Sequence, residues 1–218
     1  MPDSANSSVI KRLLYSAIDM LDIEGFITAG GKSSRMGVDK AWLEIGGRPL
    51  ISRVISALEP VVSQISIIAN SGGYEHLGYP VFGDRRPNIG PLEAIATALS
   101  HASKPRVLLV SCDMPFLTSE FLKYLVDFPD KSPIIVPEDC KKMLEPLCAI
   151  YSIKVLKTVE RQIIRGHRKV SDLFEEVPTR RIRFEQFAHL GNSKMLFENI
   201  NTPADYERAI KAVEGEAG

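Results

Sequence analysis

Short apolar runs alternate with helical patterns along this chain, and this alternation limits the folds that it can adopt. The runs with the length and composition of buried strands are residues 24–28, 65–69, 80–82, 106–111, 133–136, 147–151 and 181–184. Strands that alternate with helices form a parallel sheet, because each crossover helix returns the chain to the same sheet end. The sequence therefore predicts a three-layer, Rossmann-like α/β fold, with a mostly parallel sheet and helices on both faces.

Helix start signals stand between these runs. Pro49 and Pro91 suit the first position of two helices, since each precedes a stripe of apolar residues at helical spacing. Thr118 is placed to cap a third helix. Thr202 and Pro203 combine a cap with a first-position proline before the last helix, which we expect to be the clearest.

The length of 218 residues suits one domain, and we expect it to span residues 24–214. Residues 1–23 form an N-terminal helical extension in this interpretation. Apolar residues recur there at helical spacing, which predicts an amphipathic helix over 8–22 that packs on the domain or on a partner subunit. Asp19 and Asp22 interrupt the apolar run, so we expect neither a signal peptide nor a membrane span.

The charges balance, with 27 basic and 27 acidic side chains. A neutral balance argues against a nucleic-acid-binding surface and against attraction to a membrane. The three cysteines, Cys112, Cys140 and Cys148, lack Cys-x-x-Cys spacing and predict neither a disulfide framework nor a zinc site. We therefore expect a cytoplasmic protein. The four histidines lack metal-ligand spacing, which favours surface or structural roles.

A glycine-rich loop follows the first apolar run. The run breaks at Gly30 and Gly31, and Arg35 and Lys40 follow within ten residues. Glycines let a loop bring its backbone N–H groups close to an anion, and the two cations can neutralise phosphate charge. The loop therefore predicts a site for a nucleoside triphosphate. The alternative for Arg35 and Lys40 is that they are solvated loop charges.

Two well-known glycine motifs do not fit this loop. Gly31, Lys32 and Ser33 are similar to the end of a Walker A loop, but that motif requires a glycine where this chain has Phe26. The dinucleotide-binding motif Gly-x-Gly-x-x-Gly is excluded because Gly30 and Gly31 are adjacent. The register of the glycines therefore argues against both of these folds.

Asp113 ends the buried-strand pattern of residues 106–111 and is the candidate metal ligand. A carboxylate beside a triphosphate is repelled unless a cation lies between them, and Mg²⁺ prefers one or two carboxylates together with phosphate oxygens. We expect Mg²⁺, with Mn²⁺ as the alternative ion. Asp113 could otherwise only open the turn before Pro115. Ligands of open α/β sheets lie beyond the carboxyl ends of the strands, so the four first strand ends should converge on one cleft.

The run Ala-Gly-Gly-Lys-Ser-Ser-Arg-Met-Gly-Val-Asp-Lys at 29–40 resembles the signature of sugar-nucleotide pyrophosphorylase-type nucleotidyltransferases. Among them it is most similar to the molybdenum cofactor guanylyltransferases. Further matches follow in the order of that family: Ala69-Asn70, Gly83-Asp84, Gly90-Pro91-Leu92, Cys112-Asp113-Met114-Pro115, Glu145-Pro146 and Asn199-Ile200-Asn201-Thr202-Pro203. The resemblance covers residues 24–212. It departs at Thr28, where the family usually has leucine, and in the N-terminal extension.

This resemblance implies an activity and a set of site residues. The activity is transfer of GMP from GTP to the phosphate of molybdenum-molybdopterin, which forms the guanine dinucleotide cofactor and releases pyrophosphate. The implied catalytic residues are Arg35, Lys40 and Asp113. The implied nucleotide and substrate contacts are Thr28, Ala29, Gly30, Gly31, Lys40, Asn70, Asp84, Asp113, Asn199 and Asn201, with Asn201 as an additional metal contact.

Several roles keep an alternative at this point. Asn70 could be a turn residue, and Asn199 and Asn201 could serve only the cap of the last helix. The basic set Arg161, Arg165, His167, Arg168 and Lys169 could meet an anionic pterin phosphate or solvate the end of a helix, before a new helix that Ser171 would cap.

Two other functions compete with guanylyl transfer. One is transfer of CMP or another nucleotide to molybdopterin or to another phosphorylated acceptor. The other is a non-catalytic carrier of the molybdenum cofactor, which would not need the triphosphate loop together with a metal carboxylate. The guanylyltransferase interpretation implies GTP and molybdopterin as substrates, and transient contacts with cofactor-synthesis proteins or apo-molybdoenzymes.

Overall fold

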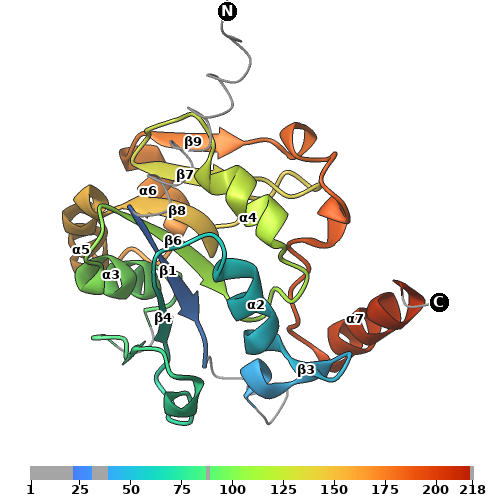
Figure 1. Cartoon of the computed structure of the whole chain (residues 1–218). Coiled ribbons are helices and arrows are strands. Elements are labelled where there is room, and N and C mark those ends of the chain that lie inside the picture. The colour runs from blue at the N-terminus through green and yellow to red at the C-terminus, as the bar shows by residue number, and fades with distance from the viewer. Residues whose placement is uncertain (1–21, 31–38, 87–88, 217–218) are drawn as a thin grey trace, which may run out of the picture.

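The structure is a computed structural model that describes residues 22–30, 39–86 and 89–216 (Figure 1). These residues contain one seven-stranded sheet in the order β5-β4-β1-β6-β8-β7-β9. The strands are β1 (Ile23–Thr28), β4 (Ile65–Ile68), β5 (Val81–Phe82), β6 (Arg106–Ser111), β7 (Ile134–Pro137), β8 (Cys148–Ser152) and β9 (Thr179–Ile182). Each overlaps a predicted run, and β9 begins two residues earlier than expected. All but the last residue of the predicted helix at 8–22 lies outside the described residues.

The sheet is mostly parallel, as predicted. β1 pairs in parallel with β4 on one side and with β6 on the other, and β4 pairs in parallel with β5. β8 is antiparallel to both of its neighbours, β6 and β7, while β9 returns to a parallel pairing with β7. The strand order therefore reverses beside β1, between β4 and β6.

Helices cover both faces of this sheet (Figure 1). The α-helices are α2 (Leu50–Leu58), α3 (Pro91–His101), α4 (Ser119–Val126), α5 (Leu156–Ile164), α6 (Val170–Glu176) and α7 (Pro203–Glu216). The short 3₁₀ helices are η1 (Lys40–Trp42), η2 (Glu75–Leu77), η3 (Ile153–Val155), η4 (Phe184–Gln186) and η5 (Ser193–Met195). α2 and α4 pack on one face, and α3, α5 and α6 pack on the other. The three-layer prediction is confirmed.

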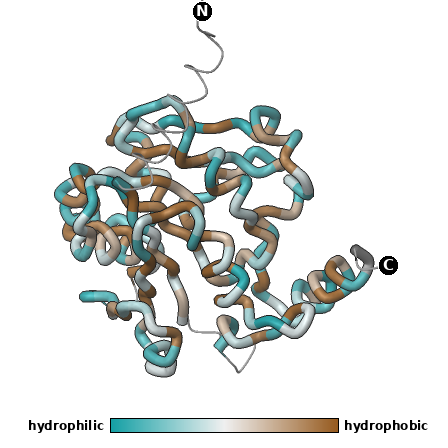
Figure 2. Tube along the Cα trace, in the orientation of Figure 1, coloured by the Kyte–Doolittle hydropathy of each residue, from teal (hydrophilic) through white to brown (hydrophobic). Residues whose placement is uncertain are grey.

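Side chains of each strand alternate between two buried cores. In β1, Ile23 and Ile27 pack with α2 and α4, whereas Phe26 packs with α3. Leu108 and Leu109 in β6 divide between the two cores in the same way, because successive strand residues point to opposite faces. Figure 2 shows the hydrophobic segments concentrated in the sheet, between more hydrophilic outer turns. None of the helices among the described residues is long and apolar enough to cross a membrane.

The helix caps largely agree with the sequence. The Thr118 side chain accepts a hydrogen bond from the Phe121 N–H at 3.2 Å. Thr202 and Asp205 form a reciprocal capping box, in which each side chain accepts from the other residue's N–H, at 3.2 and 2.7 Å. Pro49 is an exception: it lies at the N-cap of α2 rather than inside it, because it ends strand β3.

A small hairpin was not predicted. It consists of β2 (Glu44–Ile45) and β3 (Arg48–Pro49), joined by Gly46 and Gly47 with φ of +58° and +70°. Two successive positive φ values define the tight turn that matches strand twist, so the Gly-Gly pair was the signal for it. α7 packs on this hairpin, where the Tyr206 hydroxyl donates to the Glu44 carbonyl at 2.6 Å. The hairpin thus supports the helix that follows the Asn199–Asn201 segment.

Candidate active site

A cavity of about 270 Å³ opens where the strand order reverses. Its walls come from the carboxyl ends of β1 and β6, from η1 and from the start of α3. The lining residues are Thr28, Ala29, Gly30, Asp39, Lys40, Gly90, Pro91, Ala94, Ser111, Cys112, Asp113 and Leu147. This is the position where open α/β sheets bind ligands. The predicted residues Thr28, Ala29, Gly30, Lys40 and Asp113 meet in this single space, which we call the nucleotide cavity.

The glycine loop leaves the sheet at Gly30. The Ala29 N–H donates to the Ile68 carbonyl at 2.8 Å, and the Thr28 carbonyl accepts from the Cys112 N–H at 2.9 Å. Gly30 then adopts φ +67°, and a Cβ at this position would lie 2.8 Å from the Ser71 hydroxyl oxygen. Glycine therefore serves two needs there, the left-handed backbone and the close approach of the neighbouring loop. Gly31 and Arg35, which we predicted to contact phosphate, lie outside the described residues.

Asp39 holds the turn that carries Lys40, a role that we did not predict. Its carboxylate accepts from the Ala41 N–H at 3.1 Å at the start of η1, and from the Tyr74 hydroxyl at 2.6 Å. The pKa of the Tyr74 hydroxyl is raised, mainly by burial and secondly by the hydrogen bond to Asp39. The tyrosine therefore remains the donor in this bond. Asp39 stands directly before Lys40 in the glycine-loop motif, and this adjacency was the available signal.

Lys40 and Asn201 lie together although 161 positions separate them in the chain: the Lys40 ammonium donates to the Asn201 side-chain oxygen at 2.8 Å. The residue before it, Ile200, donates its N–H to the Asp113 carbonyl at 3.0 Å. These two bonds fix the segment before α7 beside the nucleotide cavity. The predicted phosphate lysine, metal carboxylate and substrate asparagine are therefore neighbours.

Asp113 has the environment of a metal ligand. Its side chain is half-buried, and its Oδ1 is buried without a hydrogen-bond partner among the described residues. An unpartnered buried carboxylate oxygen is costly unless a cation or donor meets it, so the residue fits a bound divalent cation. The pKa of the adjacent Cys112 thiol is raised, mainly by burial and secondly by the negative charge of Asp113. Cys112 is thus kept as a thiol and is packed in the core.

Glu145 is a second carboxyl group near Asp113, and its role was not predicted. Burial is the main cause that raises its pKa to about 7, and the charges of Asp139 and Asp113 add to the effect. Glu145 lines a separate cavity of about 330 Å³ together with Asn199 and Asn201. The motif Glu145-Pro146 matched the family pattern, but the motif alone did not indicate which charged groups surround the carboxyl group.

Asn70 and Asp84 bind each other. The Asn70 amide donates to Asp84 Oδ2 at 2.8 Å, and the Asp84 N–H donates to the Asn70 side-chain oxygen at 2.7 Å. The parallel register that pairs Ile68 with Phe82 sets these residues side by side, because each lies two positions further along its strand. Neither residue lines the nucleotide cavity itself. The structure thus brings this predicted pair together at the adjoining strand ends.

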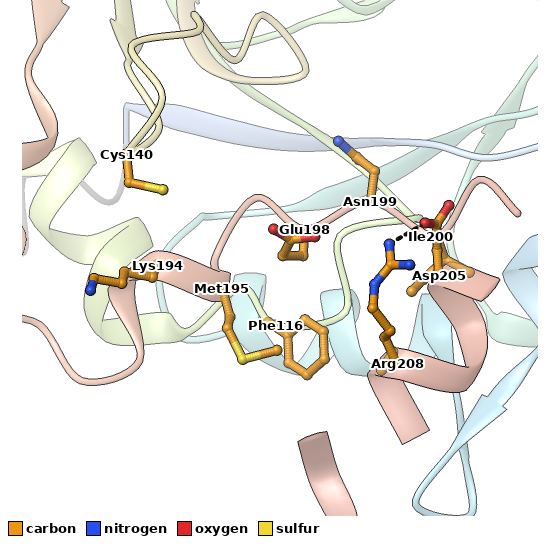
Figure 3. A pocket seen from close by; sticks show the side chains of 10 residues that line it. Phe116, Cys140, Lys194, Met195, Glu198, Asn199, Ile200, Asp205 and Arg208 are labelled. Atoms are coloured by element: carbon orange, nitrogen blue, oxygen red, sulfur yellow. Dashed lines mark hydrogen bonds and ion pairs between the residues drawn. The ribbon is translucent and has the colours of Figure 1, made fainter. Parts of the chain in front are cut away.

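Asn199 and Asn201 lie on either side of the buried Ile200 and line the same cavity of about 330 Å³. Asn199 also borders a neighbouring space of about 340 Å³, drawn in Figure 3. There Phe116 and Met195 form an apolar wall, and Arg208 reaches toward Asp205 (Figure 3). We call these two adjoining spaces the C-terminal cavities. The side chains of Thr202 and Asp205 make the cap of α7, and Asp205 also accepts from the Asn201 N–H at 3.0 Å. The Asn201 side chain accepts from Lys40, and the Asn199 side chain donates to the Phe197 carbonyl at 3.2 Å.

The basic set from Arg161 to Lys169 serves helix ends in the structure. Arg161 pairs with Glu176, and His167 pairs with Asp172 at 2.7 Å. Lys169 stands at the N-cap of α6, so the expectation that Ser171 would cap this helix was wrong. The helix starts two residues earlier than a Ser171 cap would place it, and its first residue, Val170, is buried in the core. Within the described ranges, no group of three or more His, Cys, Asp or Glu residues could hold a metal ion.

Comparisons with known proteins identify the family of this chain. Residues 25–181 match the family model for the MobA-like NTP transferase domain. A probable molybdenum cofactor guanylyltransferase from Carboxydothermus hydrogenoformans is 37% identical over 85% of this chain and 93% of its own length. A protein with the same description from Clostridium perfringens is 35% identical over 89% of this chain and 100% of its own length.

A solved structure is similar to this chain in fold. The crystal structure of molybdopterin-guanine dinucleotide biosynthesis protein A from Archaeoglobus fulgidus has a TM-score of 0.76 and 25% sequence identity, and the alignment covers 88% of this chain and 99% of that one. Fold, cavity and relatives together define the class of the protein, a nucleotidyltransferase enzyme. Within this class, the chain belongs to the MobA-like NTP transferase family.

Proposed function

We propose that this chain transfers GMP from GTP to the terminal phosphate of molybdenum-molybdopterin. An oxygen of the acceptor phosphate attacks the α-phosphorus of GTP and forms the new P–O bond. The bond between the α-phosphorus and the bridging oxygen to the β-phosphate breaks, and pyrophosphate leaves with the electron pair. The product is the guanine dinucleotide form of the cofactor.

The nucleotide cavity would hold the triphosphate. Backbone N–H groups of the loop at Gly30 and Gly31 would orient phosphate oxygens, and Arg35 would bind two of them with its planar guanidinium. Lys40 would act as a point charge at the phosphate under attack. Charge that develops on the α-phosphate and on pyrophosphate is the main obstacle in this kind of reaction, and cations held in place reduce it.

Asp113 would hold a divalent cation, with Asn201 as a further contact. The support for this role is the unpartnered, buried Oδ1 of Asp113 and the position of Asn201 beside Lys40. We propose Mg²⁺, with Mn²⁺ as the alternative ion. When bound, such a cation would neutralise phosphate oxygens and orient the triphosphate.

Asp84 and Asn70 would bind the nucleoside, together with backbone groups of Thr28 and Ala29. A carboxylate can accept hydrogen bonds from both N1–H and N2–H of guanine, a pair of donors that cytosine does not present. The Asn70 amide donates to one Asp84 oxygen at 2.8 Å, and this bond limits rotation of the carboxylate. This arrangement supports selection of guanine.

The acceptor would lie on the side of the C-terminal cavities. Asn199 and Asn201 would contact it there, close enough to Lys40 for its phosphate to reach the triphosphate. The apolar wall of Phe116 and Met195 suits the flat, heteroaromatic part of a pterin. Because the product must reach other proteins, we also propose transient contacts with cofactor-synthesis proteins or apo-molybdoenzymes.

The observation that carries this proposal is the meeting of Gly30, Lys40 and Asp113 in one cavity of a chain 37% identical to a probable guanylyltransferase. The test is to incubate the pure protein with Mg²⁺, molybdopterin and GTP, CTP or ATP, and to measure pyrophosphate. We expect release with GTP that requires both the metal and the acceptor. Release mainly with CTP would assign cytidylyl transfer instead, and no release with any nucleotide would favour a carrier.

A further inference from the structure

Two polar contacts join α3 to the segment that carries Asp84. The Thr97 hydroxyl donates to Asp84 Oδ1 at 3.4 Å. One helical turn earlier, Glu93 accepts from the Arg86 guanidinium at 2.9 Å, and both Glu93 and Thr97 are fully buried. Glu93 and Thr97 therefore hold residues 84 and 86 from the same face of the helix.

A third contact extends this pattern, since the Phe82 ring stacks on His101 with ring centroids 4.0 Å apart. Alternate residues of an extended chain advance by about 6.6 Å, and every fourth residue of an α-helix advances by about 6 Å. The two repeats match as far as Asp84, and the chain then bends at Arg85 and Arg86, where the last contact is made. We call this set the α3 ladder, and its pairs are Phe82–His101, Asp84–Thr97 and Arg86–Glu93.

The polar contacts of the ladder are a costly way to attach a helix. Glu93 loses its hydration on burial, and an apolar side chain of similar size would hold α3 at least as well. The Arg86–Glu93 ion pair instead fixes where the chain lies two residues after Asp84. Thr97 and Asn70 then hold the two oxygens of the Asp84 carboxylate, one each. The carboxylate is thus held from the helix and from the neighbouring strand end.

We infer that Glu93 and Thr97 are positioning residues for base selection, which act by fixing the Asp84 carboxylate. The inference rests on the proposed contact between Asp84 and guanine. A carboxylate that reads N1–H and N2–H needs both distances near 2.7–3.2 Å, so a shift of about 1 Å loses one of them. Glu93 and Thr97 are both fully buried, so they act on a bound base through the residues that they hold, Thr97 through Asp84 directly and Glu93 through Arg86.

The test measures nucleotide selectivity by calorimetry, as the ratio of the dissociation constants for Mg²⁺–CTP and Mg²⁺–GTP. The variants are Thr97→Val and Glu93→Gln, with Asp84→Asn as the reference and Thr97→Ser as the conservative replacement. Glu24→Gln is the matched control. Glu24 is also a buried carboxylate, 4% exposed against 0% for Glu93, and it accepts from the Ser103 N–H and hydroxyl at the opposite end of β1.

We expect Thr97→Val and Glu93→Gln to lower the ratio by roughly 3- to 10-fold, as loss of one hydrogen bond of ordinary strength to the base implies. Thr97→Ser and Glu24→Gln should keep the wild-type ratio. In the Asp84→Asn background, Thr97→Val should lower the ratio no further, an outcome that a general loss of stability would not produce. Thr97→Val carries the test alone if Glu93→Gln does not fold.

Two outcomes would overturn the inference, and they differ in what they imply for the proposed role of Asp84. If Asp84→Asn lowers the ratio while Thr97→Val and Glu93→Gln leave it unchanged, the α3 ladder does not set base selection, and the proposed role of Asp84 stands. If Asp84→Asn also leaves the ratio unchanged, Asp84 does not read the base, and both the proposed base contact and this inference are wrong.

Discussion

Asp113 and Glu145 are neighbouring carboxyl groups with different environments. Asp113 keeps a buried oxygen without a partner among the described residues, whereas burial and nearby negative charges raise the pKa of Glu145 to about 7. A cation at Asp113 would relieve the repulsion on both. The protonation state of Glu145 therefore depends in part on the charge at Asp113.

Asp113→Asn should abolish turnover and leave the fold intact. Loss of a catalytic metal ligand should cost several kcal/mol, which lowers the rate at least about 100-fold even in saturating Mg²⁺. The midpoint of thermal unfolding should stay equal or rise, because the change removes a negative charge near Glu145. Pyrophosphate release and circular dichroism measure the two effects. Turnover above about a tenth of wild type would remove Asp113 from the metal site.

Glu145→Gln should stabilise the protein more at about pH 8 than at about pH 5. The pKa of Glu145 is raised in the folded state from 4.5 to about 7. Folding thus favours the protonated form, and the contribution of this group is present at low pH and lost as the pH rises through about 7. Glutamine stays neutral and avoids that loss. Urea unfolding at both pH values measures the difference, and an equal effect at both would contradict the raised pKa.

At the scale of elements, the glycine loop depends on a backbone that other residues rarely adopt. Gly30 and Gly47 both have positive φ, of +67° and +70°. A Cβ on Gly47 would have nothing within 4 Å, whereas a Cβ on Gly30 would lie 2.8 Å from the Ser71 hydroxyl oxygen. The two positions therefore share the same backbone requirement and differ in their surroundings.

Gly30→Ala and Gly47→Ala should each reduce stability by about 1 kcal/mol, because alanine disfavours a left-handed backbone. Only Gly30→Ala should weaken GTP binding, since only this change moves the loop at the nucleotide cavity. Thermal unfolding and calorimetric titration with Mg²⁺–GTP measure the two properties. GTP binding that weakens equally in both variants would show that general destabilisation, and not the loop, is the cause.

At the scale of the whole molecule, the site joins distant parts of the chain. The Lys40–Asn201 bond and the Ile200–Asp113 backbone bond fix the segment before α7 beside the glycine loop. The hairpin at 44–49 and α7 pack against that segment, where Ile45 and Ala209 form a buried cluster with Ile200. The first and last parts of the described chain therefore form the site together.

Lys40→Ala should lower the single-turnover rate constant more than it weakens GTP binding, if the ammonium acts mainly on the transition state. Asn201→Ala should lower the same rate constant, because it releases the ammonium from its position. The double variant should lose less than the sum of the two effects, by about 0.5–3 kcal/mol. Additive losses would mean that the two residues act separately, and a change confined to the dissociation constant would make Lys40 a simple anchor.

The strands and the cavity could be predicted because their signals are local. Each apolar run is continuous in sequence, and parallel strands end at one edge, so Lys40 and Asp113 could be assigned to the same cleft. The hairpin at 44–49 was missed because its strands are only two residues long, although its Gly-Gly turn was visible.

The side-chain partners could not be predicted, because they depend on tertiary register. The Asn70–Asp84 pair follows from the pairing of β4 with β5, and the Lys40–Asn201 bond spans nearly the whole chain. The raised pKa of Glu145 likewise comes from burial and from charges on other segments. Sequence spacing carries none of this information.

The most direct test of guanylyl transfer follows the fate of the phosphates of GTP. The pure protein is incubated with Mg²⁺, molybdopterin and GTP labelled either at the α-phosphate or at the γ-phosphate. We predict that the α label appears in the modified acceptor and that the γ label is released only as pyrophosphate, with neither event in Asp113→Asn. Transfer of the γ label to the acceptor, or its release as free phosphate, would contradict nucleotidyl transfer at this site.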